Sequence, residues 1–425
     1  MIGELDPRRR PDAATPPGLV DHFFRHEYGR LVALLTRKVG TRHLARVEDA
    51  AQGALLAALT AWTTTGLPDE PGAWLYRVAC NNLIGDLRRG AGRLRILERA
   101  AAAAALPAEP QAPHFAAEVA DGMLRMLFVC CDDALPRESQ LVLALKTLCG
   151  FSTGEIALRL FTSEASVYKR LARARTRLRR APLQIDTPSI DALMSRLPSV
   201  QAVLYLLFNE GYLSVHAGQA IRRELCDEAI RLATLLAEHP AGAVPNTFAL
   251  LALMHLHAAR LASRQDGEGG LLLLEEQDRA LWDRRQMQQG AEWLARSASG
   301  DVFSKFHAEA AIAAEHGFAP SFAQTRWQEI ADLYAVLDRV DPSPLHAMNR
   351  AIAVAEVQGP EAGLAILMSS APPTWLVGSF LWDATAGDLH RRAGHVDAGC
   401  QHTERALASA PSDAVRNLLR RRAAL

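Results

Sequence analysis

The chain has 425 residues, of which 49% are hydrophobic and only 6% aromatic, and it carries equal numbers of basic and acidic side chains. The length exceeds that of one ordinary domain, and abundant alanine and leucine with few alternating β-branched runs argue against a sheet-rich protein and predict an all-α fold. Neither an N-terminal signal pattern nor an apolar run of about 18 residues occurs, so we expect no membrane segment and a cytoplasmic location.

The zero net charge conceals a separation of charge along the chain. Residues 136–182 carry ten Lys/Arg and three Asp/Glu, a net charge of +7, whereas residues 183–425 carry 21 basic and 28 acidic side chains, a net charge of −7. The first of these segments can bind a polyanion, and the second can repel or mimic one.

The N-terminal part of the chain predicts a helical block. Residues 1–18 are rich in Pro, Arg and Asp, and we expect them to be disordered. A first helical domain is expected over residues 19–89, ending in a helix from Trp74 to Arg89. Its earlier helices are predicted from two apolar sets, Leu31, Leu34 and Leu35, then Val47, Ala51, Leu55 and Leu59.

Residues 90–135 are expected to link this block to the basic segment. They include six consecutive alanines from Ala100 to Ala105 and prolines at positions 107, 110 and 113. Such low-complexity sequence is typical of a flexible linker or a frayed helix. A further helix is predicted over residues 118–132.

Residues 136–182 have the pattern of a helix-turn-helix. Ser152 and Glu155 form a capping box before a short helix, Phe161 and Thr162 supply a turn, and Ser163 offers a second N-cap. The long second helix has an apolar stripe, Val167, Leu171, Ala174 and Leu178. Its other side is polar and basic, with Ser166, Lys169, Arg170, Arg173, Arg177 and Arg180.

A helix-turn-helix places the start of its second helix in the major groove of DNA, and basic residues further along meet phosphates. The alternative is a solvated basic face with no ligand. The tight turn and the two caps favour DNA binding.

Residues 189–425 read as helical throughout. Pro344–Leu367 and Trp382–Pro411 have the pattern of helical hairpins, with Gly359 and Gly394 at the turns, 35 residues apart. This spacing is close to the tetratricopeptide period of about 34 residues, so a solenoid or a bundle of hairpins is expected.

The helix from Trp74 resembles region two of an extracytoplasmic-function sigma factor, a group of the sigma-70 family. The family helix has the form W-L-x-x-x-A-x-N-x-x-x-D-x-x-R-R, and the matching residues here are Trp74, Leu75, Ala79, Asn81, Arg88 and Arg89. Gly85 stands where the family usually has Asp, and Asp86 lies one residue later, where it is expected to orient a neighbouring Arg.

The resemblance also implies a polymerase contact. Glu48, Asp49 and Gln52 resemble the E-D-x-x-Q surface that binds the clamp helices of the RNA polymerase β′ subunit. Gly53 stands where an acidic residue is usual, and a mid-helix Gly costs about 1 kcal/mol relative to Ala. The basic helix-turn-helix would be region four, which implies contacts with the β flap and promoter DNA.

Promoter opening requires bases held outside the stack. Asn81 and Asn82 can read a base edge, since an amide both donates and accepts hydrogen bonds. Arg77, Arg88 and Arg89 can meet phosphates of the displaced strand. Trp74 is expected to be a core residue rather than a stacking platform.

The extension resembles one subgroup of these sigma factors, whose members carry a tetratricopeptide-like C-terminal domain. The matching runs are Leu204–Tyr212, Ser263–Gly267, Leu271–Arg279 and Trp282-Asp283. Their polar members could form a buried packing network or a small-ligand pocket, and we favour packing. They are Asn209, Glu210, Gln277, Asp278, Arg279 and Asp283.

Signals for catalysis, metal and cofactors are weak. Gly150–Gly154 satisfies G-x-S-x-G, but no strand is predicted before Ser152, so a hydrolase is not expected. The six cysteines have no C-x-x-C spacing and are expected to be buried apolar residues. We therefore expect no enzyme activity, no catalytic or metal-binding residue and no cofactor.

The sequence thus predicts an alternative sigma factor whose extension regulates it in cis, either by shielding the basic helix or by an activating contact, with a regulatory partner of the extension as a further possibility. The alternative is a stand-alone helix-turn-helix regulator with a helical-repeat sensor domain, and an enzyme that uses the polar cluster is a third interpretation.

Overall fold

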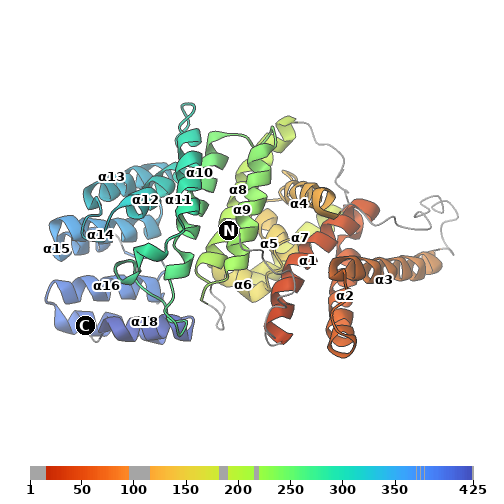
Figure 1. Cartoon of the computed structure of the whole chain (residues 1–425), viewed down its shortest axis with the longest axis horizontal. Coiled ribbons are helices and arrows are strands. Elements are labelled where there is room, and N and C mark those ends of the chain that lie inside the picture. The colour runs from red at the N-terminus through yellow and green to blue at the C-terminus, as the bar shows by residue number, and fades with distance from the viewer. Residues whose placement is uncertain are drawn as a thin grey trace, which may run out of the picture. The chain divides into compact units, whose positions relative to one another are not determined.

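The computed structural model describes residues 16–94, 115–180, 190–214 and 220–423, apart from residues 370, 374 and 378. Within these ranges the protein consists of α-helices and short 3-10 turns, and its β-structure is a single bridge between Gln265 and Leu271 (Figure 1). The predicted all-α fold is confirmed. Most of the sequence expected to be disordered or flexible, residues 1–15 and 95–114, lies outside the described residues.

The chain divides into two compact units. The first comprises Met1–Ile156 and Ala165–Ser189, and the second comprises Ala157–Glu164 and Ile190–Leu425. The division falls within the helix-turn-helix, because the end of its first helix and its turn group with the second unit.

The first unit contains seven described helices, the sixth of them in part. They are α1 (Pro16–Val39), α2 (Leu44–Thr65), α3 (Pro71–Leu94), α4 (Phe115–Cys130), α5 (Arg137–Thr147), α6 (Thr153–Arg159) and α7 (Glu164–Arg180). Helix α1 packs against α2, α3 and α4, and α2 packs along α3. Helix α4 lies wholly within residues 90–135, the predicted linker, and confirms the further helix predicted over residues 118–132, with a start three residues earlier and an end two residues earlier. It forms part of the packed unit rather than a flexible connection.

The predicted apolar sets of this unit are partly correct. Leu31, Leu34 and Leu35 are buried on α1, as expected. The stripe on α2 is wrong at its C-terminal end, where Leu59 is 36% exposed and Leu55 is half-buried. The buried face is made instead by small residues, which let α2 approach its neighbours closely; they are Val47, Ala50, Ala51, Ala54 and Ala58.

The predicted helix-turn-helix is formed by α6 and α7. The backbone N–H of Ser152 donates to Glu155 Oε2 at 2.7 Å, and the backbone N–H of Glu155 donates to Ser152 Oγ at 3.1 Å. This reciprocal pair is the predicted capping box, and it starts α6 at Thr153, three residues earlier than expected. The predicted stripe of α7 is buried in full, at Val167, Leu171, Ala174 and Leu178.

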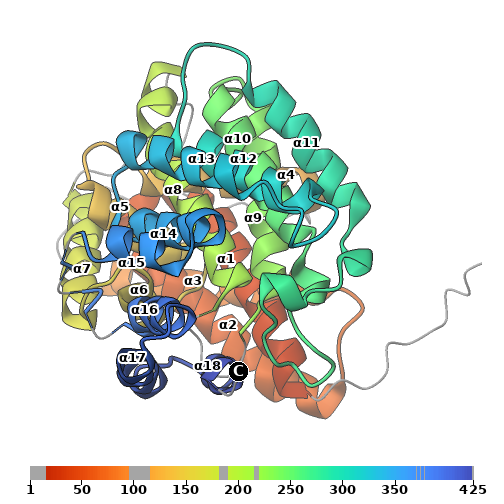
Figure 2. The same cartoon turned by 90° about the vertical axis from the view of Figure 1, so that its left-hand side faces the viewer.

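The second unit contains the remaining helices. They are α8 (Ile190–Tyr212), α9 (Arg223–Glu238), α10 (Pro245–Ala258), α11 (Arg284–Ser297), α12 (Lys305–Phe318), α13 (Trp327–Val340), α14 (Pro344–Gln358), α15 (Pro360–Leu367), α16 (Phe380–Arg392), α17 (Val396–Ala408) and α18 (Asp413–Ala423). Helix α10 is buried along almost its whole length and packs against α9, α11 and α12 (Figure 2). It is apolar all round, as a central helix must be.

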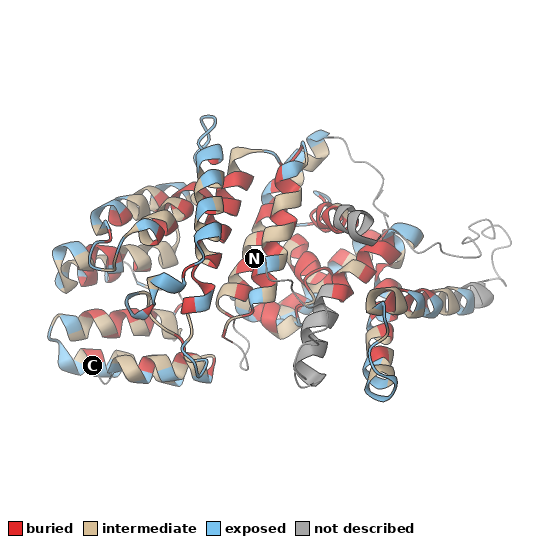
Figure 3. Cartoon of the chain, in the orientation of Figure 1, coloured by how far each residue is buried: buried red, intermediate tan, exposed pale blue. Residues whose placement is uncertain are grey.

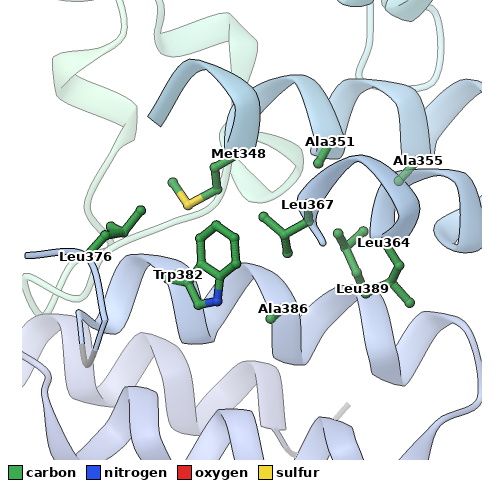
Figure 4. Packing of buried hydrophobic residues seen from close by; sticks show 9 residues of the cluster. All are labelled: Met348, Ala351, Ala355, Leu364, Leu367, Leu376, Trp382, Ala386 and Leu389. Atoms are coloured by element: carbon green, nitrogen blue, oxygen red, sulfur yellow. The ribbon is translucent and has the colours of Figure 1, made fainter. Parts of the chain in front are cut away.

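The two predicted hairpins are confirmed as α14–α15 and α16–α17. Gly359 and Gly394 stand at their turns with φ of 91° and 82°, a backbone conformation that residues with a Cβ rarely adopt. Trp382 and Leu389 of α16 pack against Met348 of α14 and Leu364 and Leu367 of α15 (Figure 4). Burying each such side chain contributes about 1.5–3 kcal/mol.

Burial along these hairpins follows the sequence pattern. In Figure 3 buried and exposed residues alternate along the helices, as expected where one face packs on a neighbour.

Five cysteines are buried, but Cys400 is exposed, so the expectation that all six are core residues is wrong. None of the described helices is both long and apolar enough to span a membrane.

Candidate nucleic-acid and polymerase interface

Helix α7 presents a row of exposed basic side chains opposite its buried stripe. Lys169, Arg173 and Arg177 are exposed, and they are spaced by four residues, so they follow one face of the helix. The capped start of α6 and the buried stripe fix the helix beneath them. Three cations at this spacing can contact successive phosphates while the start of the helix enters a groove.

Two of the predicted DNA-contacting residues are engaged within the protein. Arg170 is half-buried, and its Nη2 lies 2.6 Å from Glu138 Oε2 on α5. Ser166 is also half-buried. The ion pair of Arg170 joins α7 to α5, in addition to any contact that Arg170 makes with DNA.

Sequence reasoning missed Tyr168. Its ring is 57% exposed near the start of α7, and its hydroxyl accepts a hydrogen bond from Thr153 Oγ1 at 3.2 Å. An aromatic side chain in this position offers an apolar surface to a base edge. Its position directly before Lys169 could have indicated this role, but a search for basic residues alone does not include a tyrosine.

Helix α3 carries the predicted base-reading residues on its exposed surface. Arg77, Asn81 and Arg88 are spaced by four and seven residues and share one face, with Asn82 and Arg89 beside them; all five are exposed. A Cβ added to Gly53 of α2 would lie 3.2 Å from Asn82 Nδ2, so α3 approaches α2 closely at this glycine.

Two neighbours of this face have structural roles. Asp86 lies 3.5 Å from Arg46 Nε and 3.9 Å from Arg89 Nη2, so it orients arginines as expected. Trp74 is half-buried, with its ring centroid 5.5 Å from that of Trp62 on α2. The pair joins α3 to α2, which supports a packing role for Trp74.

The predicted polymerase-binding residues differ sharply in exposure. Asp49 and Gln52 are exposed, but Glu48 is only 2% exposed. Its carboxylate accepts a hydrogen bond from Thr147 Oγ1 of α5 at 2.8 Å and one from Arg175 Nη2 of α7 at 2.6 Å. In this arrangement the helix-turn-helix domain therefore covers Glu48.

Burial raises the pKa of Glu48, and the neighbouring Arg175 and Thr147 oppose that effect. A carboxylate held by an arginine and a hydroxyl in the interior is costly to separate from its partners. Glu48 thus works as a link between α2 and the helix-turn-helix domain.

The turn of the helix-turn-helix packs within the second unit. Arg159, the last residue of α6, donates from Nε to Glu210 Oε2 at 3.0 Å and from Nη2 to the carbonyl of Leu213 at 2.8 Å. Phe161, in the turn, has a φ of 49° and packs against Trp375, with ring centroids 4.5 Å apart and the rings tilted by 42°. The extension therefore supplies partners for a strained part of the DNA-binding motif.

The polar cluster predicted in the extension has mixed roles. Glu210 is fully buried and is bound by Arg159, Ser214 and Arg222, so it serves packing. Asp278 and Asp283 accept hydrogen bonds from backbone N–H groups and cap the 3-10 turn Arg279–Leu281 and helix α11. Among the described residues no group of His, Cys, Asp or Glu could hold a metal ion.

Comparison with known proteins gives three findings. The family model for sigma-70 region 4 matches residues 125–178, and that of a family of unknown function (DUF6596) matches residues 196–298. An uncharacterized protein of Rhizobium meliloti (strain 1021) is 35% identical over 382 residues, which cover 87% of each chain. No solved structure matches.

Proposed function

We propose that this chain, whose residues 125–178 match the family model for sigma-70 region 4, is an alternative sigma factor of the extracytoplasmic-function group that binds core RNA polymerase and directs initiation at specific promoters. The observation that carries the proposal is the helix-turn-helix within the matched region, with an exposed basic row at Lys169, Arg173 and Arg177. This row would dock at the −35 element. Catalysis would belong to the polymerase.

The second part of the proposal concerns promoter opening. The exposed face of α3 with Arg77, Asn81 and Arg88 would hold the displaced strand of the −10 element, with Asn82 and Arg89 beside it. Amides read base edges, and guanidinium groups meet phosphates.

The third part concerns polymerase. Asp49 and Gln52 are exposed and would meet the β′ clamp helices, whereas Glu48 is covered by α5 and α7. We infer that the domain of α5–α7 leaves α2 when polymerase binds, since Glu48 cannot reach a partner while Thr147 and Arg175 hold it. The separated domain would then be free to dock on the β flap.

The fourth part is regulation in cis by a tetratricopeptide-like extension. Arg159 and Phe161 of the helix-turn-helix find their partners in Glu210 and Trp375. These contacts support an activating extension, which holds the turn in its DNA-binding conformation, rather than one that only shields the basic row.

The test is run-off transcription with purified core polymerase on DNA from upstream of the protein's own gene. The wild type should give a specific start, and the triple variant Lys169→Ala/Arg173→Ala/Arg177→Ala should lose it. The matched control is Arg339→Ala, which removes an exposed positive charge of α13 and should leave the transcription start unchanged. Phe161→Ala should lower the yield if the extension supports the motif, and a higher yield would favour shielding.

The burial of Glu48 also favours a second candidate, a stand-alone regulator that never joins polymerase. Binding of fluorescent core polymerase to the full chain decides between the two. Asp49→Ala/Gln52→Ala should weaken core binding without changing DNA binding by the free protein. If the wild type binds DNA but never core polymerase, the stand-alone regulator is the correct interpretation.

A further inference from the structure

Three arginines lie together in the second unit, and none of them has a carboxylate partner among the residues that the structure describes. Arg260 follows α10, Arg264 lies a turn further on, and Arg279 begins the 3-10 turn before α11; Arg260 is only 9% exposed. Each has contacts in the described part of the chain, but no carboxylate there lies within 4 Å of any of them. Burial is the largest cause that lowers the pKa of Arg264 and of Arg279, and the charge of Arg260 lowers both further.

The contacts that these arginines do make are with neutral groups. Arg279 Nη1 donates to the carbonyls of His316 and Ala319, both at 2.8 Å. Arg260 Nε donates to Gln277 Oε1 at 3.3 Å, and the guanidinium of Arg264 lies 3.6 Å above the ring of Tyr212. Carbonyls and rings compensate a buried cation only in part, so the cluster retains an excess of positive charge.

Two buried donors in this cluster have no acceptor in the structure. Arg279 Nη2 and the indole Nε1 of Trp282 are buried and have no hydrogen-bond partner in the described part of the chain. The two side chains are stacked, with the Arg279 guanidinium 4.4 Å from the centre of the Trp282 ring. Since Arg and Trp can only donate, the group missing here is an acceptor.

A pocket of about 540 Å³ adjoins these donors. It lies between the start of α11 and the end of α12, two helices that pack on each other and on α10. Arg279, Arg284 and Gln288 give it polar groups. Trp282, Met287 and Phe318 give it apolar walls. Its volume falls in the range of about 300–1,000 Å³ that is usual for small-molecule sites.

We propose that this pocket binds a small anionic ligand, whose carboxylate or phosphate is held by Arg279 and Arg284 and whose apolar part packs on Trp282, Met287 and Phe318. An oxyanion supplies the acceptors and the negative charge that the cluster lacks, and guanidinium groups bind such planar or tetrahedral oxyanions with two donors at once. The proposal is independent of sigma-factor activity, because every residue in it lies in the extension.

The probes are phenyl phosphate and benzoate, with inorganic phosphate and phenol as partial mimics. We expect both aromatic oxyanions to bind the full-length protein at millimolar concentration, as fragments of this size do, and to shift the indole N–H resonance of Trp282. Phenol lacks the charge and inorganic phosphate lacks the ring, so each should bind more weakly. The readouts are calorimetry and the nuclear magnetic resonance spectrum of the tryptophan side chains.

Arg284→Ala is the decisive variant, because this side chain is exposed and its loss should not alter folding. It should weaken phenyl phosphate binding about ten-fold, the usual effect of losing one charge-assisted hydrogen bond, with an unchanged melting temperature of the free protein. Arg285→Ala, the next residue on α11, is also exposed but does not line the pocket, and it should bind like wild type.

Three outcomes would overturn the proposal. Equal binding of phenol and phenyl phosphate would show an apolar pocket without anion recognition. An equal loss in Arg284→Ala and Arg285→Ala would show only a general effect of surface charge. No binding of either aromatic oxyanion at millimolar concentration would show that the arginine cluster serves packing alone.

Discussion

The two units differ in how they treat a buried charge. In the first unit the carboxylate of Glu48 lies within hydrogen-bond distance of Arg175 and Thr147. In the second unit three arginines lie together with no carboxylate within 4 Å among the described residues; they are Arg260, Arg264 and Arg279. The first site is complete by itself, so its charge holds two parts of the chain together. The second site lacks a hydrogen-bond acceptor, so its positive charge is available to a ligand. The difference separates a buried charge that fixes a conformation from one that marks a binding site.

The largest effect is expected at Glu210, the complete buried site of the second unit. Glu210→Ala leaves Arg222, which is 4% exposed, and Arg159 without this partner. Breaking a buried ion pair costs about 3–5 kcal/mol, so the variant should lose about 3 kcal/mol of unfolding free energy in urea. Glu329→Ala, an exposed carboxylate of α13, should change stability by less than about 0.5 kcal/mol. An equal loss of unfolding free energy in the two variants would show that the buried, paired carboxylate stabilises the fold no more than an exposed one.

A smaller loss is expected from Arg175→Ala, which leaves Glu48 with Thr147 alone. Because Arg175 is 33% exposed, solvent screens part of the pair, and we expect about 2 kcal/mol, measured by urea unfolding. The same variant should bind core polymerase more tightly, since Glu48 is released. Arg179→Ala is the control, because this exposed side chain of α7 bonds only to Thr176 in the described structure. Unchanged stability would mean that Glu48 is not a link.

DNA affinity should respond to whether a cation of α7 already has a partner. Lys169→Ala and Arg173→Ala should each reduce the slope of log affinity against log salt by about 0.9, the value for one phosphate contact. Arg170→Ala should reduce it less, because Arg170 is bound to Glu138. Fluorescence anisotropy over a series of salt concentrations measures the slopes. A larger reduction of the slope for Arg170→Ala than for Lys169→Ala and Arg173→Ala would mean that Arg170, and not the other two, contacts phosphate.

A further prediction concerns the loss of stability in acid. Burial and nearby arginines lower the pKa of His257 to about 3 and that of His316 to about 4. The unfolded chain, with histidine pKa values near 6.5, then binds more protons than the folded one, so stability is complete above about pH 6.5 and falls as the pH drops towards 4. Melting temperatures between pH 7.5 and pH 5 should show this fall, and His316→Gln should flatten it. A curve that the variant leaves unchanged would exclude His316 as a cause.

The sequence predicted what depends on local pattern. The capping box of Ser152 and Glu155, the stripe of α7 and the hairpin turns at Gly359 and Gly394 all follow from residues within one or two helical turns of each other. It could not predict the burial of Glu48, because Thr147 and Arg175 lie 99 and 127 residues further along the chain.

Other misses have the same origin. The exposure of Leu59 and Cys400 depends on which neighbours α2 and α17 meet, and the helical period alone does not specify them. The arginine cluster is built from loops after α10 and before α11, where no periodic pattern exists. Local chemistry thus fixes elements, whereas the partners of a buried charge depend on tertiary structure.

The contact of Phe161 with Trp375 also sets an order of events during synthesis. A ribosome that adds about 5–20 residues per second needs on the order of 10–40 s to pass from the first residue to the second. Throughout that interval the left-handed turn at Phe161 has no ring to support it. A nascent chain therefore lacks this contact of its helix-turn-helix until most of the extension has been synthesised.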